Sequence, residues 1–199
     1  MTTWGSGGLH ALVWRARSVL PSEHRALLDH IGVQEAVVNV WPEGVQDLYL
    51  TLQQPSPVRR EIDGALALWL EELRVVAFNA PALEQATDGL TDDDRYLAVA
   101  RLAWHEYGHA LSFTQSTPEQ RRRGPDLLAL LPSRMQATID YPNGYRRAQV
   151  FDEVIAVVYA VLIPRVYGSV RNDDYGCPAF LHPDVFEAFK EVIPWRPSR

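Results

Sequence analysis

The chain has little of what marks several protein classes. Cys177 is the one cysteine in 199 residues, which excludes an internal disulfide framework and is typical of a reducing compartment. The first twenty residues hold no uninterrupted apolar core and no small-residue cleavage site, so no signal peptide is predicted. The longest apolar run, 154–164, is far too short to cross a bilayer. We therefore expect a cytoplasmic protein without a membrane segment.

Repeats, low-complexity segments and an excess of positive charge are also lacking. The net charge of −6 argues against nucleic acid as the main partner. A length of 199 residues with 47% hydrophobic residues suits one soluble domain. It leaves room for an N-terminal helical appendage at 1–32.

Hydrophobic spacing and breaker residues predict the order of the elements. Strands are expected at 35–41, 47–53 and 74–83, and helices at 8–20, 21–31, 58–73, 91–113, 147–164 and 182–193. Between 114 and 145 the sequence is polar and broken, apart from a short apolar island at 127–131. Strands come first and most helices later, which favours an α+β domain over a βαβ array.

The predicted helix at 91–113 carries the pattern H-E-x-x-H within "LAWHEYGHAL". His105 and His109, four residues apart, project from one face of a helix and can bind one tetrahedral metal ion. Glu106 lies about a quarter-turn away, where a carboxylate can accept a proton from a water on the metal. Apolar residues surround these groups, and buried histidine and glutamate need partners or a metal. Gly108 would permit close approach of another backbone.

A catalytic zinc site needs a third protein ligand, and Glu153 is the stronger candidate. Its helix is otherwise almost entirely apolar, so a buried carboxylate there needs a positive partner. Ala156 and Ala160 share its face and would let this helix pack closely against the first. Two alternatives remain: Glu153 and Asp152 lie on an exposed first turn, or His182 is the third ligand. Asp152 could also orient one of the histidines.

The two segments together resemble the gluzincin arrangement of metallopeptidases. More narrowly, "HEYGHAL" is similar to the start of the ImmA/IrrE-type enzymes, and "EVIAVVYAVLIP" keeps the spacing of their second motif, E-A-N-x-F-A-x-x-L-L-M-P. Val154 and Ile155 stand where that motif has A-N. The resemblance spans 74–164.

The resemblance implies a zincin-like α+β fold, in which a small mixed sheet packs on the H-E-x-x-H helix beside a second ligand-bearing helix. It implies Zn²⁺ held by His105, His109 and Glu153, with Glu106 as general base. It also implies that a peptide substrate pairs with a sheet edge, for which 74–80 is the expected strand.

The sequence also offers candidates for two further roles. An oxyanion donor is needed for peptide hydrolysis, and five residues in turn-rich stretches are candidates: Tyr145, Tyr167, Arg171, Tyr175 and His182. Residues 121–123 are three arginines, expected in a solvated loop, with binding of an acidic substrate or partner as the alternative.

The leading hypothesis is a zinc metallopeptidase that hydrolyses a protein or peptide substrate, with a regulatory target by analogy to the resembled family. Three rivals remain: a zinc-binding regulatory module without turnover, a metal-dependent hydrolase of another substrate, and a metal-free form of the fold. The sequence does not predict an oligomeric state.

Overall fold

The computed structural model describes residues 6–51, 64–139, 149–167 and 177–195, with the side chains of 8–51, 64–139, 149–164 and 177–195. Its helices are α1 (Ser6–Ser18), α2 (Ser22–Ile31), α3 (Glu43–Thr51), α5 (Ala80–Ala86), α6 (Asp92–Gln115), α7 (Pro118–Arg122), α8 (Gly124–Leu130), α9 (Ser133–Gln136), α10 (Gln149–Tyr167) and α11 (Pro183–Val192). Its strands are β1 (Gln34–Val38), β2 (Ala67–Leu70) and β3 (Val75–Asn79).

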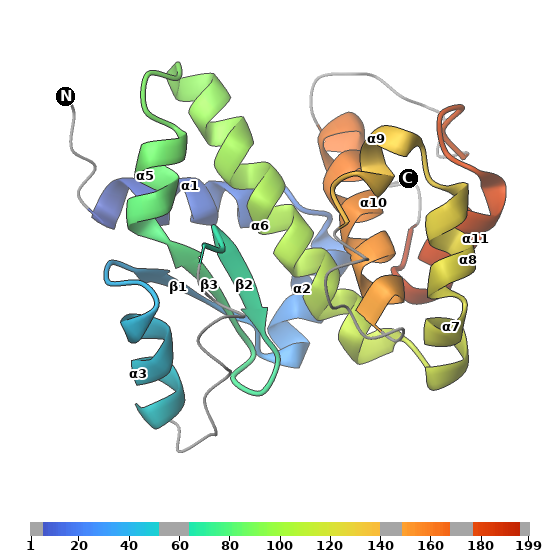
Figure 1. The fold of residues 1–199 in the computed structure, drawn as a ribbon, viewed down its shortest axis with the longest axis horizontal. Helices are drawn as coiled ribbons and strands as arrows, with labels where there is room; N and C mark the ends of the chain where they lie inside the picture. Colours follow the sequence, from blue (N-terminus) through green and yellow to red (C-terminus); the bar gives the residue numbers. More distant parts are fainter. Residues whose placement is uncertain (1–5, 52–63, 140–148, 168–176, 196–199) are drawn as a thin grey trace.

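The three strands form one small mixed sheet in the order β1-β3-β2. β1 pairs parallel with β3, and β2 pairs antiparallel with β3. The predicted α+β class is therefore confirmed, with helices making up most of the described chain (Figure 1). The prediction that 74–80 forms a sheet edge is wrong, because β3 is the central strand and β2 lies at the border of the sheet.

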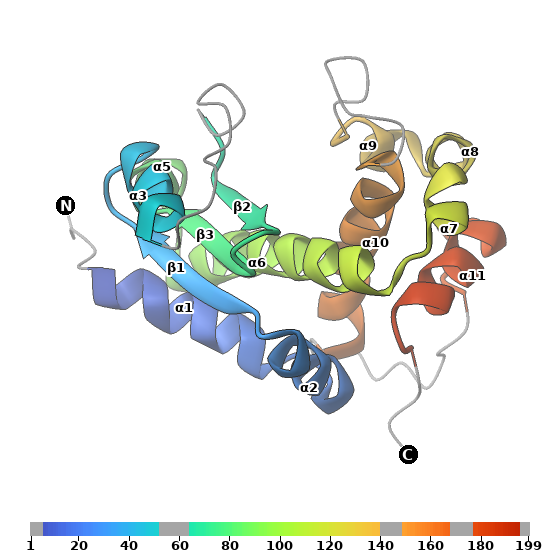
Figure 2. The ribbon, with the colours of Figure 1, turned by 90° about the horizontal axis from the view of Figure 1, so that it is seen from below.

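Both faces of the sheet are covered. Trp69 and Phe78 face the main hydrophobic core, which also contains residues of α1, α6 and α10. Leu70 and Ala77 face a second, smaller cluster with Val45 of α3. Figure 2 shows α3 and α1 on opposite sides of the strands. The sheet thus lies between α3 on one face and α1, α6 and α10 on the other.

The N-terminal helices belong to the main core. Leu9 and Val13 of α1 and Leu28 of α2 are buried in it. The indole N–H of Trp104 on α6 donates a hydrogen bond to the carbonyl of Ala16, 2.9 Å away. α1 therefore packs along the back of α6.

α6 is the element that the sequence predicted best. Thr91 caps it by accepting a hydrogen bond from the Asp94 N–H at 3.2 Å, and three aspartates occupy its first turn. Negative charge there is favoured by the helix dipole. The helix continues to Gln115, two residues beyond the predicted end.

Two predictions of element type are wrong. Residues 47–53 were expected to form a strand, but 43–51 form helix α3, in which Val45 and Tyr49 are buried one turn apart. Residues 58–73 were expected to form a helix, but 67–70 form strand β2. Both faces of this short strand are covered, so its sequence is uniformly apolar and lacks the alternation that identifies a half-exposed strand.

Smaller differences concern where elements end. β3 stops at Asn79, whose side chain caps α5 by accepting a hydrogen bond from the Ala82 N–H at 3.2 Å. α10 does not end at Pro164 but runs on to Tyr167. The polar stretch after α6 forms three short helices, α7 to α9. No helix in the described part of the chain is long and apolar enough to cross a membrane.

Candidate metal centre

His105 and His109 project from the same face of α6. The Nε2 atoms of His105 and His109 lie 3.1 Å apart, and the two rings meet edge to face with centroids 4.6 Å apart. The four-residue spacing on the helix produces this arrangement. The two nitrogens therefore point at one shared position.

Glu153 on α10 completes the group. One carboxylate oxygen lies 3.6 Å from His105 Nε2, and the other lies 3.5 Å from His109 Nε2. Glu153 is only 8% exposed and Asp152 only 9%, so the alternative of an exposed first turn is wrong. Potential ligand atoms of His105, His109 and Glu153 lie within 4.8 Å of one another. His182 belongs to no such group in the described chain and instead caps α11, its Nδ1 accepting from the Asp184 N–H at 3.2 Å.

These distances fit a tetrahedral zinc ion. Two ligand atoms, each about 2.05 Å from the metal and separated by a tetrahedral angle, are about 3.3 Å apart. The two imidazole nitrogens are 3.1 Å apart, and each lies 3.5 or 3.6 Å from a different oxygen of the Glu153 carboxylate. Two imidazoles and one carboxylate with one position left over is the donor set of a catalytic zinc site.

The protonation state of the histidines also suits a metal. Burial lowers the pKa of His105 to about 3, with a further lowering from the charge of His109. Burial lowers the pKa of His109 to about 4. Both imidazoles are therefore neutral near pH 7 and keep a lone pair for a cation.

Glu106 lies beside this group without belonging to it. Its side chain is buried, and this burial raises its pKa to about 8, with a further increase from the charge of Glu153. The main-chain N–H of Trp69 on β2 donates to its carboxylate and lowers the pKa in part. A carboxylate whose pKa lies near neutrality is well suited to accept and release a proton.

The closeness of the two helices depends on Gly108. A Cβ at this position would lie 2.7 Å from Ala156 Cα and 3.1 Å from Tyr159 Cβ. Such contacts are too short, so the backbones of α6 and α10 approach more closely here than any side chain at 108 would permit. The expectation of a close approach through Gly108 and Ala156 is confirmed.

The edge of β2 that pairs with no other strand of the described chain passes next to Glu106. The N–H of Asn79 donates to the carbonyl of Leu66 at 2.9 Å, and inward- and outward-directed residues alternate in an antiparallel pair. The N–H and C=O groups of Ala67 and Trp69 therefore point away from β3. The sequence missed this edge because 67–70 was read as part of a helix.

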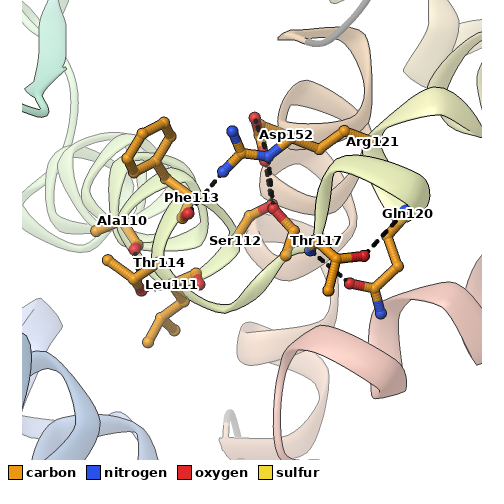
Figure 3. A network of polar contacts seen from close by, with 10 residues as sticks. Ala110, Leu111, Ser112, Phe113, Thr114, Thr117, Gln120, Arg121 and Asp152 are labelled. Carbon is orange, nitrogen blue, oxygen red and sulfur yellow. Dashed lines mark hydrogen bonds and ion pairs between the residues drawn. The ribbon is translucent and has the colours of Figure 1, made fainter.

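Asp152 does not contact either histidine, and its predicted role in orienting one is wrong. Its Oδ1 accepts a hydrogen bond from the Ser112 hydroxyl at 2.5 Å, and the Ser116 hydroxyl also bonds to it. Arg121 lies on its other side, with Nε 3.8 Å from Oδ2 (Figure 3). Burial is the main cause that raises the pKa of Asp152, although these three neighbours oppose it.

The three arginines at 121–123 have three different environments. Arg121 on α7 is held against the end of α6, contrary to the expectation of a solvated loop. Arg122 is exposed, as expected, and Arg123 pairs with Glu191 of α11 at 2.9 Å. No sequence pattern separates Arg121 from its neighbours, because the contacts that hold it come from another helix.

In the described part of the chain, none of the five oxyanion candidates is placed at the site. Tyr145, Arg171 and Tyr175, and the side chain of Tyr167, lie outside the described parts of the chain. His182 serves as the cap of α11. Comparisons with protein-family models, curated proteins and solved structures found no match to this chain.

Proposed function

We propose that this protein is a zinc-dependent metallopeptidase of the zincin type, related in arrangement to the ImmA/IrrE group. The observation that carries the proposal is the spacing of His105, His109 and Glu153, which fits one tetrahedral ion. Glu106 beside them supplies the proton acceptor that distinguishes a catalytic zinc site from a structural one.

Bound zinc would supply an acidified water as nucleophile and would polarise the scissile carbonyl. Glu106 accepts a proton from the attacking water and delivers it to the leaving amine. The hydrogen bond from Trp69 N–H fixes the orientation of the Glu106 carboxylate for both transfers. Gly108 allows α10 to come near enough for Glu153 to face the histidines.

The outward N–H and C=O groups of Ala67 and the outward C=O of Trp69 support a peptide substrate, while the Trp69 N–H stays bonded to Glu106. An extended peptide can add to such an edge as a further strand, held by main-chain hydrogen bonds. Trp69 also contacts Glu106, so a peptide bound along β2 passes the proton acceptor. A protein or peptide is therefore the proposed substrate.

Metal analysis tests the proposed ligands. We expect about one zinc per chain in the wild type, and its loss in His109→Ala and Glu153→Ala. His30→Ala is the matched control, because His30 is an exposed histidine on α2. Retention of zinc by Glu153→Ala would refute the proposed metal centre.

Peptide cleavage tests the proposed chemistry. Mass spectrometry of a mixed peptide library should show cleavage by the wild type and a rate lower by a factor of about 10²–10⁴ in Glu106→Gln, which keeps the shape of the side chain and the zinc. Equal cleavage by the two proteins contradicts the role of Glu106. Zinc binding without any cleavage favours the second candidate, a zinc-binding regulatory module without turnover.

A further inference from the structure

The guanidinium of Arg121 is anchored on three sides at the end of α6 (Figure 3). Its Nε donates to the Ser116 hydroxyl at 2.8 Å, and Nη2 donates to the Phe113 carbonyl at 2.6 Å. The guanidinium carbon lies 4.5 Å from the centroid of the Phe113 ring. A group fixed in this way loses little further freedom when it binds a ligand.

Much of the hydrogen-bonding capacity of Arg121 is unused. A guanidinium has about five N–H donors, and Arg121 makes only the two hydrogen bonds to Ser116 and Phe113 within the described chain. Asp152 does not take up the remainder, because it lies 3.8 Å from Nε and already accepts from two serine hydroxyls. The side chain of Arg121 is 22% exposed, so part of it is open to solvent.

Arg121 lies close to the candidate metal centre. Phe113, on which it stacks, follows His109 by four residues, or about 6 Å along the axis. Asp152 directly precedes Glu153 on α10. Two residues of an extended peptide span about 6.6 Å, which is comparable with this offset along α6, so Arg121 is expected to lie about two substrate residues from a bond cleaved at the proposed metal.

The direction of β2 tells which side of that bond faces Arg121. Trp69 contacts Glu106, and Glu71, just after β2, is within electrostatic reach of Arg121. β2 therefore runs in the same sense as α6, as Figure 1 also shows. A peptide added antiparallel to β2 runs the opposite way, so its N-terminal part lies at the Arg121 end.

We infer that Arg121 binds a carboxylate of the substrate, on an aspartate or glutamate about two residues before the scissile bond. This inference rests on the proposed metallopeptidase function and narrows its substrates to peptides with an acidic residue at that position. A carboxylate accepts two parallel hydrogen bonds from the planar guanidinium, which neutral side chains of the same size cannot match. Glu71 is a competing carboxylate within electrostatic reach of Arg121.

Peptide hydroxamates test the inference without requiring turnover. The probes are N-acetyl tripeptides that end in a hydroxamic acid, which anchors them on the metal, with glutamate or glutamine at the first, second or third residue before it. The wild type should bind the glutamate form about five- to tenfold more tightly at the second residue. Arg121→Gln should reduce this ratio to about one.

Matched variants separate Arg121 from general charge effects. Arg122→Gln removes the same charge from the exposed neighbouring residue and should keep the glutamate preference. Glu71→Gln removes the competing carboxylate and should increase it. If Arg121→Gln folds poorly, Arg121→Lys is the second variant, because lysine can keep the ion pair with Asp152. It should still lose most of the preference for glutamate over glutamine, because lysine lacks the planar guanidinium.

The outcomes distinguish this inference from the function on which it rests. If wild-type protein containing zinc binds both forms equally at every position, or if Arg121→Gln retains the preference, the assignment of Arg121 is overturned and the metal centre stands. If no hydroxamate binds the zinc-loaded wild type, the metallopeptidase proposal fails, and this inference fails with it.

Discussion

At the scale of single residues, the lack of a side chain at 108 decides how close the two helices that carry the candidate ligands come. A Cβ added to Gly108 would lie 2.7 Å from the Cα atom of Ala156 on α10. Because the obstacle is backbone, no change of a neighbouring side chain can remove it. The distance between the histidines and Glu153 thus depends on a residue that binds nothing.

Gly108→Ala should lower the free energy of unfolding by about 1–3 kcal/mol, because the extra methyl group forces α6 and α10 apart. Zinc affinity should fall as well, since Glu153 moves with α10. Chemical denaturation with a chelator present and zinc titration measure the two effects. The double variant with Ala156→Gly should not recover stability, and full recovery would contradict the assigned backbone contact.

Ser112 has a comparable role one helical turn further along the same interface between α6 and α10. Its fully buried hydroxyl donates to the buried carboxylate of Asp152 at 2.5 Å. A buried acceptor that loses its donor keeps its desolvation cost. Ser112 therefore helps to hold the first turn of α10, which carries Glu153, against α6.

Ser112→Ala should destabilise the protein by about 1–3 kcal/mol at pH 7. A double-mutant cycle with Asp152→Asn measures the coupling through urea denaturation. The effect of Ser112→Ala should be smaller in the Asp152→Asn background, because an amide is less costly to leave unpaired than a buried charge. Additive effects would show that the two side chains are not energetically coupled.

Residue-level chemistry was also where sequence reasoning was most informative. The four-residue spacing places both histidines on one face of any helix, and the cost of a carboxylate in an apolar helix singles out Glu153. The ligand role of these residues stays a prediction. The partners of Asp152 could not be predicted, since Ser112 is 40 residues away in sequence and no local pattern links the two.

At the scale of elements, the long amphipathic and apolar helices were predictable and the short elements were not. α6 has a capping threonine and an acidic first turn, which are local signals. α3 and β2 have few residues, and their apolar side chains fit either element type. Their structure is decided by the sheet and by the cores on its two faces.

His24 links three elements through one buried ring. Its Nε2 donates to the Pro194 carbonyl at 2.7 Å, which leaves Nδ1 to accept from the Tyr159 hydroxyl at 3.0 Å. The ring is therefore satisfied in its neutral form, and burial lowers its pKa. α2, α10 and the segment after α11 share this contact.

The lowered pKa predicts a loss of stability in acid. Below about pH 6.5 the unfolded histidine takes up a proton, whereas the folded one does so only at lower pH. The free energy of unfolding should therefore fall as the pH decreases from 7 to 5. In His24→Gln this decrease should be smaller, as measured by urea denaturation with a chelator present. An unchanged pH dependence would contradict the assigned environment of His24.

At the scale of the whole molecule, the candidate centre lies between α6 and α10, two helices that also pack against each other. Two donors lie on α6 and the third lies on α10. The general packing of these helices could be anticipated from their apolar surfaces. The order of the strands could not, because pairing within a sheet is not encoded in any one strand.

The proposed metal centre predicts that zinc stabilises the folded chain by linkage. At a free zinc concentration of 100 times the dissociation constant, the gain is about 2.7 kcal/mol, or a rise in melting temperature of about 5–10 °C for a protein of this size. Thermal unfolding with zinc and with a chelator measures the difference. Glu153→Ala should abolish most of it, whereas Glu106→Gln should retain it.

The position of α10 late in the chain has a consequence for biosynthesis. A nascent chain that ends at α9 already contains His105, His109 and Glu106, but it lacks the third candidate donor on α10. It also exposes the apolar face of α6 that α10 covers in the folded protein. A nascent chain of that length should therefore be prone to aggregation and should lack the complete set of candidate metal ligands. The proposed metal centre could form only after α10 has been synthesised and has docked on α6.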